Sequence, residues 1–264
     1  MAKVGRHRSR GGSAAYSRRQ ARAKGERHED GFGDHRGVSG GVGRALAQQL
    51  GQAGDRVVHG LSRTPAAPIK GVTHGYLDLE DEASMAAAAA RIAGGPAPTL
   101  VIVATGVLHS GQTPERSWRE LSAEHLMRDY RINAVGPALA ARHFLPLLPR
   151  DERAVFAALS ARVGSIGDNR LGGWHSYRAS KAALNMILKT LSVELARTHP
   201  QAVVAGLHPG TVDTALSAPF QRGVKPEKLF SAAFSAASLL TVIEGLTPAD
   251  SGGVFAWDSA RIPE

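Results

Sequence analysis

The chain has 264 residues, of which 43% are apolar, enough for one α/β domain with a substantial core. It contains no cysteine, which excludes disulfides, thiolate metal sites and cysteine nucleophiles. No apolar stretch approaches the roughly 20 residues that span a bilayer, so no membrane partner is expected and a cytoplasmic location fits.

The net charge of +9 is concentrated at the amino-terminal end. Residues 1–36 carry ten Lys or Arg and four Asp or Glu, a net charge of +6, which leaves +3 for the other 228 residues. This segment has no sustained apolar period, so it cannot bury enough surface to offset its ordering entropy. We therefore predict a disordered basic head over residues 1–36, and we expect nucleic acid as a partner only through this head.

From residue 37 onward, strand and helix patterns alternate. The expected strands cover residues 56–61, 72–79, 99–104, 154–159, 202–207 and 254–257. The expected helices cover residues 41–50, 81–93, 120–148, 177–198 and 226–246. This alternation predicts a single α/β domain over residues 37–264, built as a Rossmann-type, doubly wound parallel sheet.

A glycine-rich sequence opens the first expected helix. Gly37, Gly41 and Gly43 have the spacing Gly-x3-Gly-x-Gly. Glycines at such a place let the backbone approach a pyrophosphate, and the helix amino terminus offers free N–H groups. For this motif alone, a flexible glycine loop is at least as good an interpretation.

Tyr177 and Lys181 lie four residues apart at the start of the expected helix 177–198. This spacing places both side chains on one helix face. A lysine ammonium beside a tyrosine hydroxyl favours the phenolate and lowers the tyrosine pKa from about 10, so the phenol can exchange a proton with a substrate oxygen. Most such pairs are solvated surface neighbours, so the other motifs must show whether this pair belongs to an active site.

Six motifs, taken together and in order, resemble the short-chain dehydrogenase/reductase superfamily. They are the glycine motif, Asp78-Leu79, Ala104-Thr105-Gly106, Asn133 within Ile132–Pro137, Tyr177-x3-Lys181, and Pro209 to Thr214. The residues before Tyr177 and the sequence His208-Pro209-Gly210 are most similar to the C-factor-like branch of the superfamily. The resemblance runs from Gly37 to the end of the chain. It implies an NAD(P)-dependent oxidoreductase acting on a small carbonyl or alcohol substrate.

The resemblance implies a role for each matching residue. Tyr177 would be the general acid or base, Lys181 would lower its pKa and bind the nicotinamide ribose, and Asn133 would hold a water that relays protons. The implied cofactor-binding residues are Gly37, Gly41, Gly43, Arg63, Asp78, Gly106, Tyr177, Lys181, Pro209, Gly210, Val212 and Thr214. Alone, Asn133 would be a locally satisfied helix residue and Asp78 an acid at a helix start. No metal site is predicted.

The serine that this family uses to bind the substrate oxygen has no clear counterpart. Alignment through Val163-Gly164 puts Ala161 at its usual place, between Ser160 and Ser165. Ser165 is favoured as the catalytic serine, because its distance of 12 residues from Tyr177 is close to the usual gap. Both serines have an alternative interpretation as turn residues.

Arg63 bears on the choice of cofactor. It follows the second expected strand, where an acid would bind the ribose 2′-hydroxyl of NAD and a basic residue would accommodate the 2′-phosphate of NADP. No acid lies beside Arg63, so NADP is favoured, with NAD as the alternative. An ordinary surface arginine is an equally good interpretation of this one residue.

The first strand of the expected sheet has no counterpart in the sequence. Residues 29–36 are mostly glycine and charged residues, which cannot form a buried central strand. The fold is therefore expected with its first strand missing or replaced. The abrupt start of the resemblance at Gly37 suggests that residues 1–36 are not native and come from a shifted reading frame or a mis-set start.

Two further functional interpretations remain open at this stage. A catalytically impaired binding or signalling protein would explain Ala161 and the missing strand, although Tyr177, Lys181 and Asn133 argue against it. Association with nucleic acid would depend on the basic head. The resemblance also implies a homodimer or homotetramer, assembled through the helices at 120–148 and 177–198.

Overall fold

The structure is a computed structural model that describes residues 38, 40–109 and 113–264. Gly37 and the basic head therefore lie outside the described residues, and their predictions stay open. The described residues all belong to one compact unit, in agreement with a single α/β domain.

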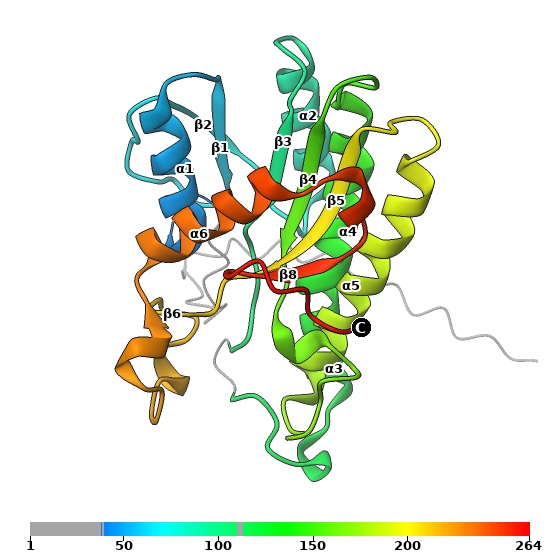
Figure 1. Cartoon of the computed structure of the whole chain (residues 1–264). Helices are drawn as coiled ribbons and strands as arrows, with labels where there is room; N and C mark the ends of the chain where they lie inside the picture. The colour runs from blue at the N-terminus through cyan, green and yellow to red at the C-terminus, as the bar shows by residue number, and fades with distance from the viewer. Residues whose placement is uncertain (1–37, 39, 110–112) are drawn as a thin grey trace, which may run out of the picture. The chain divides into compact units, whose positions relative to one another are not determined.

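Parallel strands form the centre of this unit (Figure 1). A four-stranded sheet has the order β3 (Leu100–Val103), β4 (Ala154–Leu159), β5 (Ala202–His208) and β8 (Val254–Ala256). Two further pairs are β1 (Val58–Ser62) with β2 (Val72–Tyr76), and β6 (Thr211–Val212) with β7 (Leu229–Phe230). Every one of these pairings is parallel, which confirms the predicted class of sheet.

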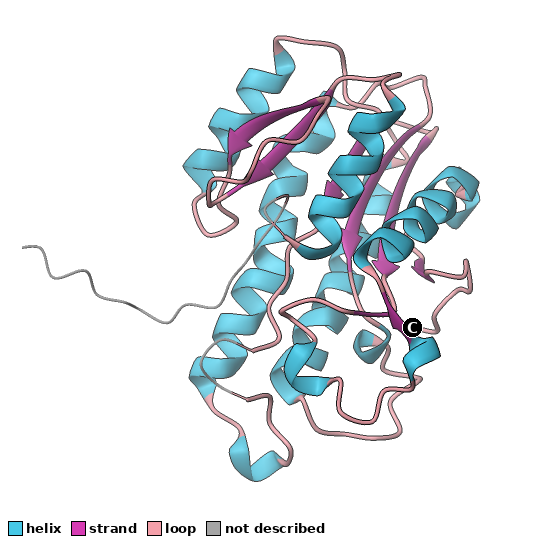
Figure 2. Ribbon diagram, turned by 90° about the vertical axis from the view of Figure 1, so that its left-hand side faces the viewer, coloured by secondary structure: helices cyan, strands magenta, loops and turns pink. Residues whose placement is uncertain are grey.

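Helices cover both faces of the sheet, as Figure 2 shows. The α-helices are α1 (Gly41–Ala53), α2 (Glu82–Ala93), α3 (Ala123–Tyr130), α4 (Gly136–Phe144), α5 (His175–Leu195) and α6 (Ala232–Gly245). Short helical turns are η1 (Trp118–Glu120), η2 (Arg131–Val135), η3 (Leu145–Leu147), η4 (Arg162–Gly164), η5 (Ala218–Phe220), η6 (Pro226–Lys228) and η7 (Pro248–Asp250).

The sequence of β4 explains why both faces are covered. Successive side chains of a strand point to opposite faces. Val155 and Ala157 therefore join the apolar core under α1 and α6, while Phe156 and Ala158 join the core under α2, α4 and α5. A strand buried on both faces must be apolar at every position, which is why β4 reads as an unbroken apolar run.

Two predicted helices differ from the observed ones. The expected helix 120–148 is interrupted by the π-helical turn η2, so that α3 and α4 are separate helices. The expected helix 226–246 begins later, with α6 at Ala232, because residues 226–230 form η6 and β7 instead. Local apolar periodicity does not distinguish these short elements from a continuous helix.

A cavity of about 740 Å³ separates β1 from β3. Its walls include Val58 to Leu61 of β1, Leu100 to Val103 of β3, and Phe144 of α4. Three of the four β3 residues are only half-buried, whereas five of the six β4 residues are buried. In the part of the chain that the structure describes, no strand lies between β1 and β3. The residues of the predicted missing strand lie outside that part, so this prediction stays open.

Val38 lies at one end of this cavity. It is buried, lines the cavity, and donates its backbone N–H to the Leu61 carbonyl at 3.4 Å. Both strand edges that face the cavity carry backbone groups that need hydrogen-bond partners. The cavity thus has the position of one further parallel strand, with Val38 at its carboxyl end.

Candidate active site

A second cavity, of about 460 Å³, lies at the carboxyl ends of β3, β4 and β5. In a doubly wound sheet, ligands bind at this edge. The cavity brings together residues from separate motifs of the sequence, namely Gly40, Gly41, Gly106, Ala161, Tyr177, Lys181, Pro209, Gly210, Val212 and Thr214. The fold therefore assembles the predicted glycine loop, the Tyr–Lys pair and the Pro-Gly turn around one space.

Tyr177 and Lys181 line the cavity from the first turns of α5. Both are buried, with 8% and 2% of their surfaces exposed, so they are not a solvated surface pair. The Lys181 ammonium donates to the Leu159 carbonyl at 2.7 Å and lies 5.8 Å from the centroid of the Tyr177 ring. The end of β4 thus fixes the lysine beside the tyrosine.

The protonation of this pair differs from the sequence expectation. Burial raises the pKa of Tyr177 above its ordinary value, and the Asp129 carboxylate adds to this effect. Burial also lowers the pKa of Lys181 to about 8, against the attraction of Asp129. Desolvation disfavours both charged forms and is the largest influence on both pKa values. Tyr177 is therefore a neutral phenol with a proton to donate.

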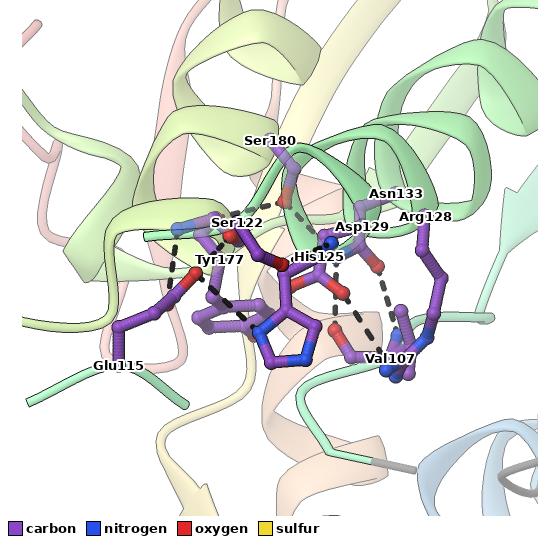
Figure 3. A network of polar contacts seen from close by, with 10 residues as sticks. Val107, Glu115, Ser122, His125, Arg128, Asp129, Asn133, Tyr177 and Ser180 are labelled. Atoms are coloured by element: carbon purple, nitrogen blue, oxygen red, sulfur yellow. Dashed lines mark hydrogen bonds and ion pairs between the residues drawn. The ribbon is translucent and has the colours of Figure 1, made fainter. Parts of the chain in front are cut away.

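Asn133 lies on the π-helical turn η2 and is fully buried. Its side chain accepts from the Val107 N–H and donates to the Val107 carbonyl, both at 2.8 Å. It also donates to the Ser180 hydroxyl at 3.0 Å, and Ser180 donates to the Tyr177 carbonyl. In Figure 3 these residues form a chain of contacts between the loop after β3 and α5. Asn133 thus positions the Tyr177 helix, and its role in a water relay stays a prediction.

The three candidate positions for the substrate-binding serine lie in different surroundings. Ala161 lines the cavity and packs against Tyr177. Ser160 also lines the cavity, but its hydroxyl donates to Asn185 Oδ1 at 2.6 Å. Ser165 is buried and absent from the cavity lining, and its hydroxyl accepts from the Asp168 N–H at 3.1 Å.

We expect Ala161→Ser to raise kcat about tenfold, because it places a hydroxyl beside Tyr177 where a developing oxyanion would need a donor. Steady-state kinetics with a panel of aldehydes and ketones would measure this gain. Ser165→Ala is the matched control, since it removes a serine from the same loop. A loss of activity in Ser165→Ala, with no gain in Ala161→Ser, would instead assign the role to Ser165.

The glycines at the start of α1 leave room for a phosphate group. Gly40 is the N-cap of α1 and supplies no side chain, and the first helical turn carries no acid. Gly41 has a φ of +53°, and a Cβ there would lie 3.2 Å from Thr214. The uncapped N–H groups and the positive end of the helix suit an anion. Gly43 is buried on α1 and lines the larger cavity instead.

The Pro209-Gly210 turn also leaves no room for a side chain at its glycine. Gly210 has a φ of +77°, and a Cβ there would lie 2.6 Å from the Phe230 ring. A side chain at this position would therefore displace the aromatic group beneath the turn. The turn brings Val212 and Thr214 to the same cavity as Tyr177, as the resemblance implied.

Arg63 and Asp78 line a small cavity beyond the ends of β1 and β2. The Arg63 guanidinium lies 4.0 Å from the Asp78 carboxylate and 3.8 Å from that of Glu80. These half-buried ion pairs hold Arg63 at the position predicted for the 2′-phosphate side of a dinucleotide. Thr105 lines both this small cavity and the main one, which places the two cavities next to each other.

Aromatic side chains form the opposite wall of the main cavity. The Trp174 ring centroid lies 5.1 Å from that of Phe220 and 6.3 Å from that of Tyr177. His109 packs on Phe220 and contacts the Ala215 carbonyl but is not part of the lining. His208 does line the cavity, and burial lowers its pKa to about 4, so it is neutral.

No motif in the sequence singled out Asp129, which is buried one helical turn before Asn133. Burial raises the pKa of this carboxyl to about 6, and the neighbouring Glu115 carboxylate adds to the shift. The Arg128 guanidinium lies 3.8 Å from the Asp129 carboxylate. The only signal in the sequence for a buried carboxyl at Asp129 is its spacing of four residues before Asn133, which places both on one helix face.

We expect Asp129→Asn to stabilise the protein by about 2 kcal/mol at pH 7.5. Because the pKa of Asp129 in the folded state lies above its unfolded value, stability should fall as the pH rises from about 4 to 6. The variant should lose this part of the pH dependence. Urea denaturation at pH 4 and 7.5 would measure it, with the exposed Asp151→Asn as control. An equal stability difference from wild type at both pH values would contradict the prediction.

The parallel sheet with a buried Tyr–Lys pair beside a glycine-rich helix start defines the class of nicotinamide-dependent oxidoreductases. Comparison with known families agrees, because the model described as short chain dehydrogenase matches residues 36–225. The chain therefore belongs to the short-chain dehydrogenase family, as its motifs predicted.

Individual relatives support this assignment. C-signal of Myxococcus xanthus is 34% identical over 139 residues, which cover 52% of this chain and 78% of that protein. This match agrees with the predicted C-factor-like branch. A 1-hydroxy-2-glutathionyl-2-methyl-3-butene dehydrogenase of Rhodococcus sp. is 31% identical over 222 residues, covering 82% and 92% of the two chains.

The fold is shared with solved reductases. An NADPH-bound carbonyl reductase from chicken fatty liver superposes with a TM-score of 0.72 at 24% identity, covering 87% of this chain and 97% of that one. Among the helices that the structure describes, none is both long and apolar enough to cross a membrane.

Proposed function

We propose that the protein is an NADP-dependent reductase of small, mostly apolar carbonyl compounds, with Tyr177 as proton donor. The observation that carries this proposal is the buried Tyr177–Lys181 pair at the edge of the cavity that the glycine loop and the Pro-Gly turn also line. Family membership supports the reaction class, and the site supports the assignment of roles.

In the proposed reaction, Tyr177 donates its phenolic proton to the substrate oxygen as that oxygen gains negative charge. The bound dinucleotide supplies the hydride that reduces the carbonyl carbon. Lys181 stabilises the phenolate left on Tyr177, since its ammonium is held on the same helix face. In alcohol oxidation, Tyr177 would take the proton back as a general base.

The choice of NADP rests on Arg63. Its ion pairs with Asp78 and Glu80 hold the guanidinium at the edge of the small cavity, where a 2′-phosphate would meet a positive charge. The NADPH bound to the chicken carbonyl reductase, which shares this fold, is consistent with the same choice.

The substrate class follows from the cavity wall. Trp174, Phe220, Leu108 and Leu216 present apolar surface, and the ionisable lining residues are Tyr177, Lys181 and the neutral His208. A cationic substrate would have no opposite charge in this lining, and the Lys181 ammonium already donates to the Leu159 carbonyl, so uncharged aldehydes or ketones with an apolar substituent fit best.

Binding of the cofactor is the first experiment. Quenching or enhancement of NADPH fluorescence should give a Kd at least tenfold lower than that for NADH, and Arg63→Ala should remove most of this preference. Equal affinities would refute the assignment of NADP.

A second function has a specific observation in its favour. The cavity between β1 and β3 lies behind the glycine loop, and Ala161 stands at the place of the expected serine, which would suit a protein that keeps the fold but binds cofactor poorly. Failure to bind either nucleotide would favour this impaired binding or signalling protein over the enzyme.

A further inference from the structure

Glu115 is a buried carboxylate on the loop that follows β3, and only 2% of its surface is exposed. All of its strong contacts are with the start of α5. Its Oε2 accepts the Ser176 N–H at 3.2 Å, and its Oε1 accepts the Ser176 hydroxyl. Its main-chain carbonyl accepts the Trp174 N–H at 2.5 Å. Figure 3 shows Glu115 beside Tyr177 and His125.

These contacts supply a helix cap that the local sequence lacks. α5 begins at His175, and its N-cap residue, Trp174, makes no side-chain capping hydrogen bond. The first N–H groups of a helix have no partner within the helix and favour a negative charge nearby. Glu115 provides that acceptor from a position 61 residues before Ser176. Tyr177 follows Ser176 directly, so the cap lies at the turn that carries the proton donor.

The same contacts hold the aromatic wall. Trp174 has a φ of 51°, a left-handed conformation that is unfavourable for a bulky residue. It follows Gly172 and Gly173, which also have positive φ, and the Glu115 carbonyl closes this turn. Because Trp174 packs on Tyr177 and lines the cavity, one loop residue restrains both the wall and the proton donor.

Glu115 can keep its negative charge despite burial. Desolvation raises the pKa of its carboxyl, but the hydrogen bonds from Ser176 and the nearby His125 outweigh this, so that its pKa lies below the ordinary value. The His125 Nδ1 lies 3.8 Å from Oε1. The acceptor is therefore ionised at neutral pH, when the cap is strongest.

We propose that Glu115 is a positioning residue, which holds Tyr177 and Trp174 in the arrangement that the carbonyl substrate requires. Its effect on turnover rests on the proposed function. Its effect on the geometry of the α5 start does not, and this difference makes the two separable by experiment.

The experiment compares Glu115→Ala, Glu115→Gln and Ser176→Ala with the control Glu120→Gln. Glu120 lies on the same loop, is exposed, and accepts only a local N–H from Arg116. We expect Glu115→Ala to lower kcat about 30-fold per folded molecule, because small misplacements of a proton donor are costly. The Kd for NADPH should change less than about threefold. Glu115→Gln should recover most of kcat, since its amide oxygen still accepts the Ser176 N–H.

A second measurement does not depend on activity. The chain has three tryptophans, so Trp118→Phe with Trp257→Phe leaves Trp174 as the single fluorophore. In this background Glu115→Ala should red-shift the emission and increase acrylamide quenching, while Glu120→Gln should leave both unchanged. The partly rescued Glu115→Gln variant keeps the test valid if Glu115→Ala does not fold.

The outcomes separate the alternatives. In one outcome, Glu115→Ala lowers the melting temperature, while kcat stays within about twofold and the Trp174 emission maximum within about 2 nm of the parent protein, on the order of experimental error. Glu115 would then only stabilise the fold, and the proposal would be overturned. A fluorescence change without a change in kcat would overturn the catalytic part. Wild-type protein with no reductase activity would refute the proposed function. Trp174 emission would still test whether Glu115 holds Trp174 at the start of α5.

Discussion

Tyr177→Phe is expected to lower kcat by about 10³-fold, within the range that general acid catalysis contributes. The substitution removes the hydroxyl proton but keeps the ring, which packs against Leu108, Ala161 and Trp174. The Kd for NADPH should therefore stay within about threefold of wild type. Stopped-flow or steady-state NADPH oxidation with a reactive aldehyde would measure the loss.

Tyr130→Phe is the matched control, because Tyr130 lies on α3 with 43% of its surface exposed and is outside the cavity lining. It should behave as wild type. Turnover of Tyr177→Phe within tenfold of wild type would refute Tyr177 as the proton donor. In that case the buried Lys181, whose pKa of about 8 allows proton exchange, becomes the next candidate.

Replacing residues 31–36 with an alternating Val and Ile sequence is expected to raise the free energy of unfolding by about 3 to 6 kcal/mol. The cavity between β1 and β3 offers an apolar position between two strand edges. Six buried aliphatic side chains contribute roughly 1.5 to 3 kcal/mol each, offset by about 1 to 2 kcal/mol per ordered residue. The melting temperature should rise by about 10 °C, and NADPH should bind more tightly because the glycine loop gains its support.

A Gly-Ser sequence of equal length is the control for this replacement, since it restores chain length without apolar side chains. Equal melting temperatures for the two replacements would show that the cavity does not take a strand from this direction. Deletion of residues 1–36 adds a second comparison. A large loss of stability would show that the head itself supports the cavity, contrary to our proposal that residues 1–36 are foreign to the fold. Mass spectrometry of the native amino terminus tests that proposal directly.

The grouping of the candidate site residues could be predicted from the sequence because these residues lie in short motifs of fixed spacing. Tyr177 and Lys181 share a helix face in any α-helix, and a Pro-Gly turn after an apolar strand needs little tertiary context. Asn133, Gly41 and Thr214 were assigned by resemblance, and the fold brings all of them to the neighbourhood of Tyr177. The parallel sheet followed from the alternation of strands and helices, whereas the order of its strands came from the structure.

Other features depend on contacts between distant segments, which no local pattern reveals. The π-helical turn that carries Asn133 interrupts a sequence that otherwise reads as one helix. Glu115 caps a helix that begins 60 residues later, and Asp129 acquires its raised pKa only because α3 and α5 bury it. The sequence also predicted a lowered tyrosine pKa, and this was wrong for the structure, because burial of Tyr177 was not visible from spacing.

By itself, the sequence determined the α/β class and the pairing of Tyr177 with Lys181 on one helix face, because these depend on periodicity and spacing. Only the tertiary structure decided where the charges are desolvated, which hydrogen bonds Ser160 and Ser165 make, and what holds the start of α5. The physical reason is that solvation and hydrogen bonding depend on which segments meet in space. For Tyr177 those segments are the end of β4, the loop after β3, and α3.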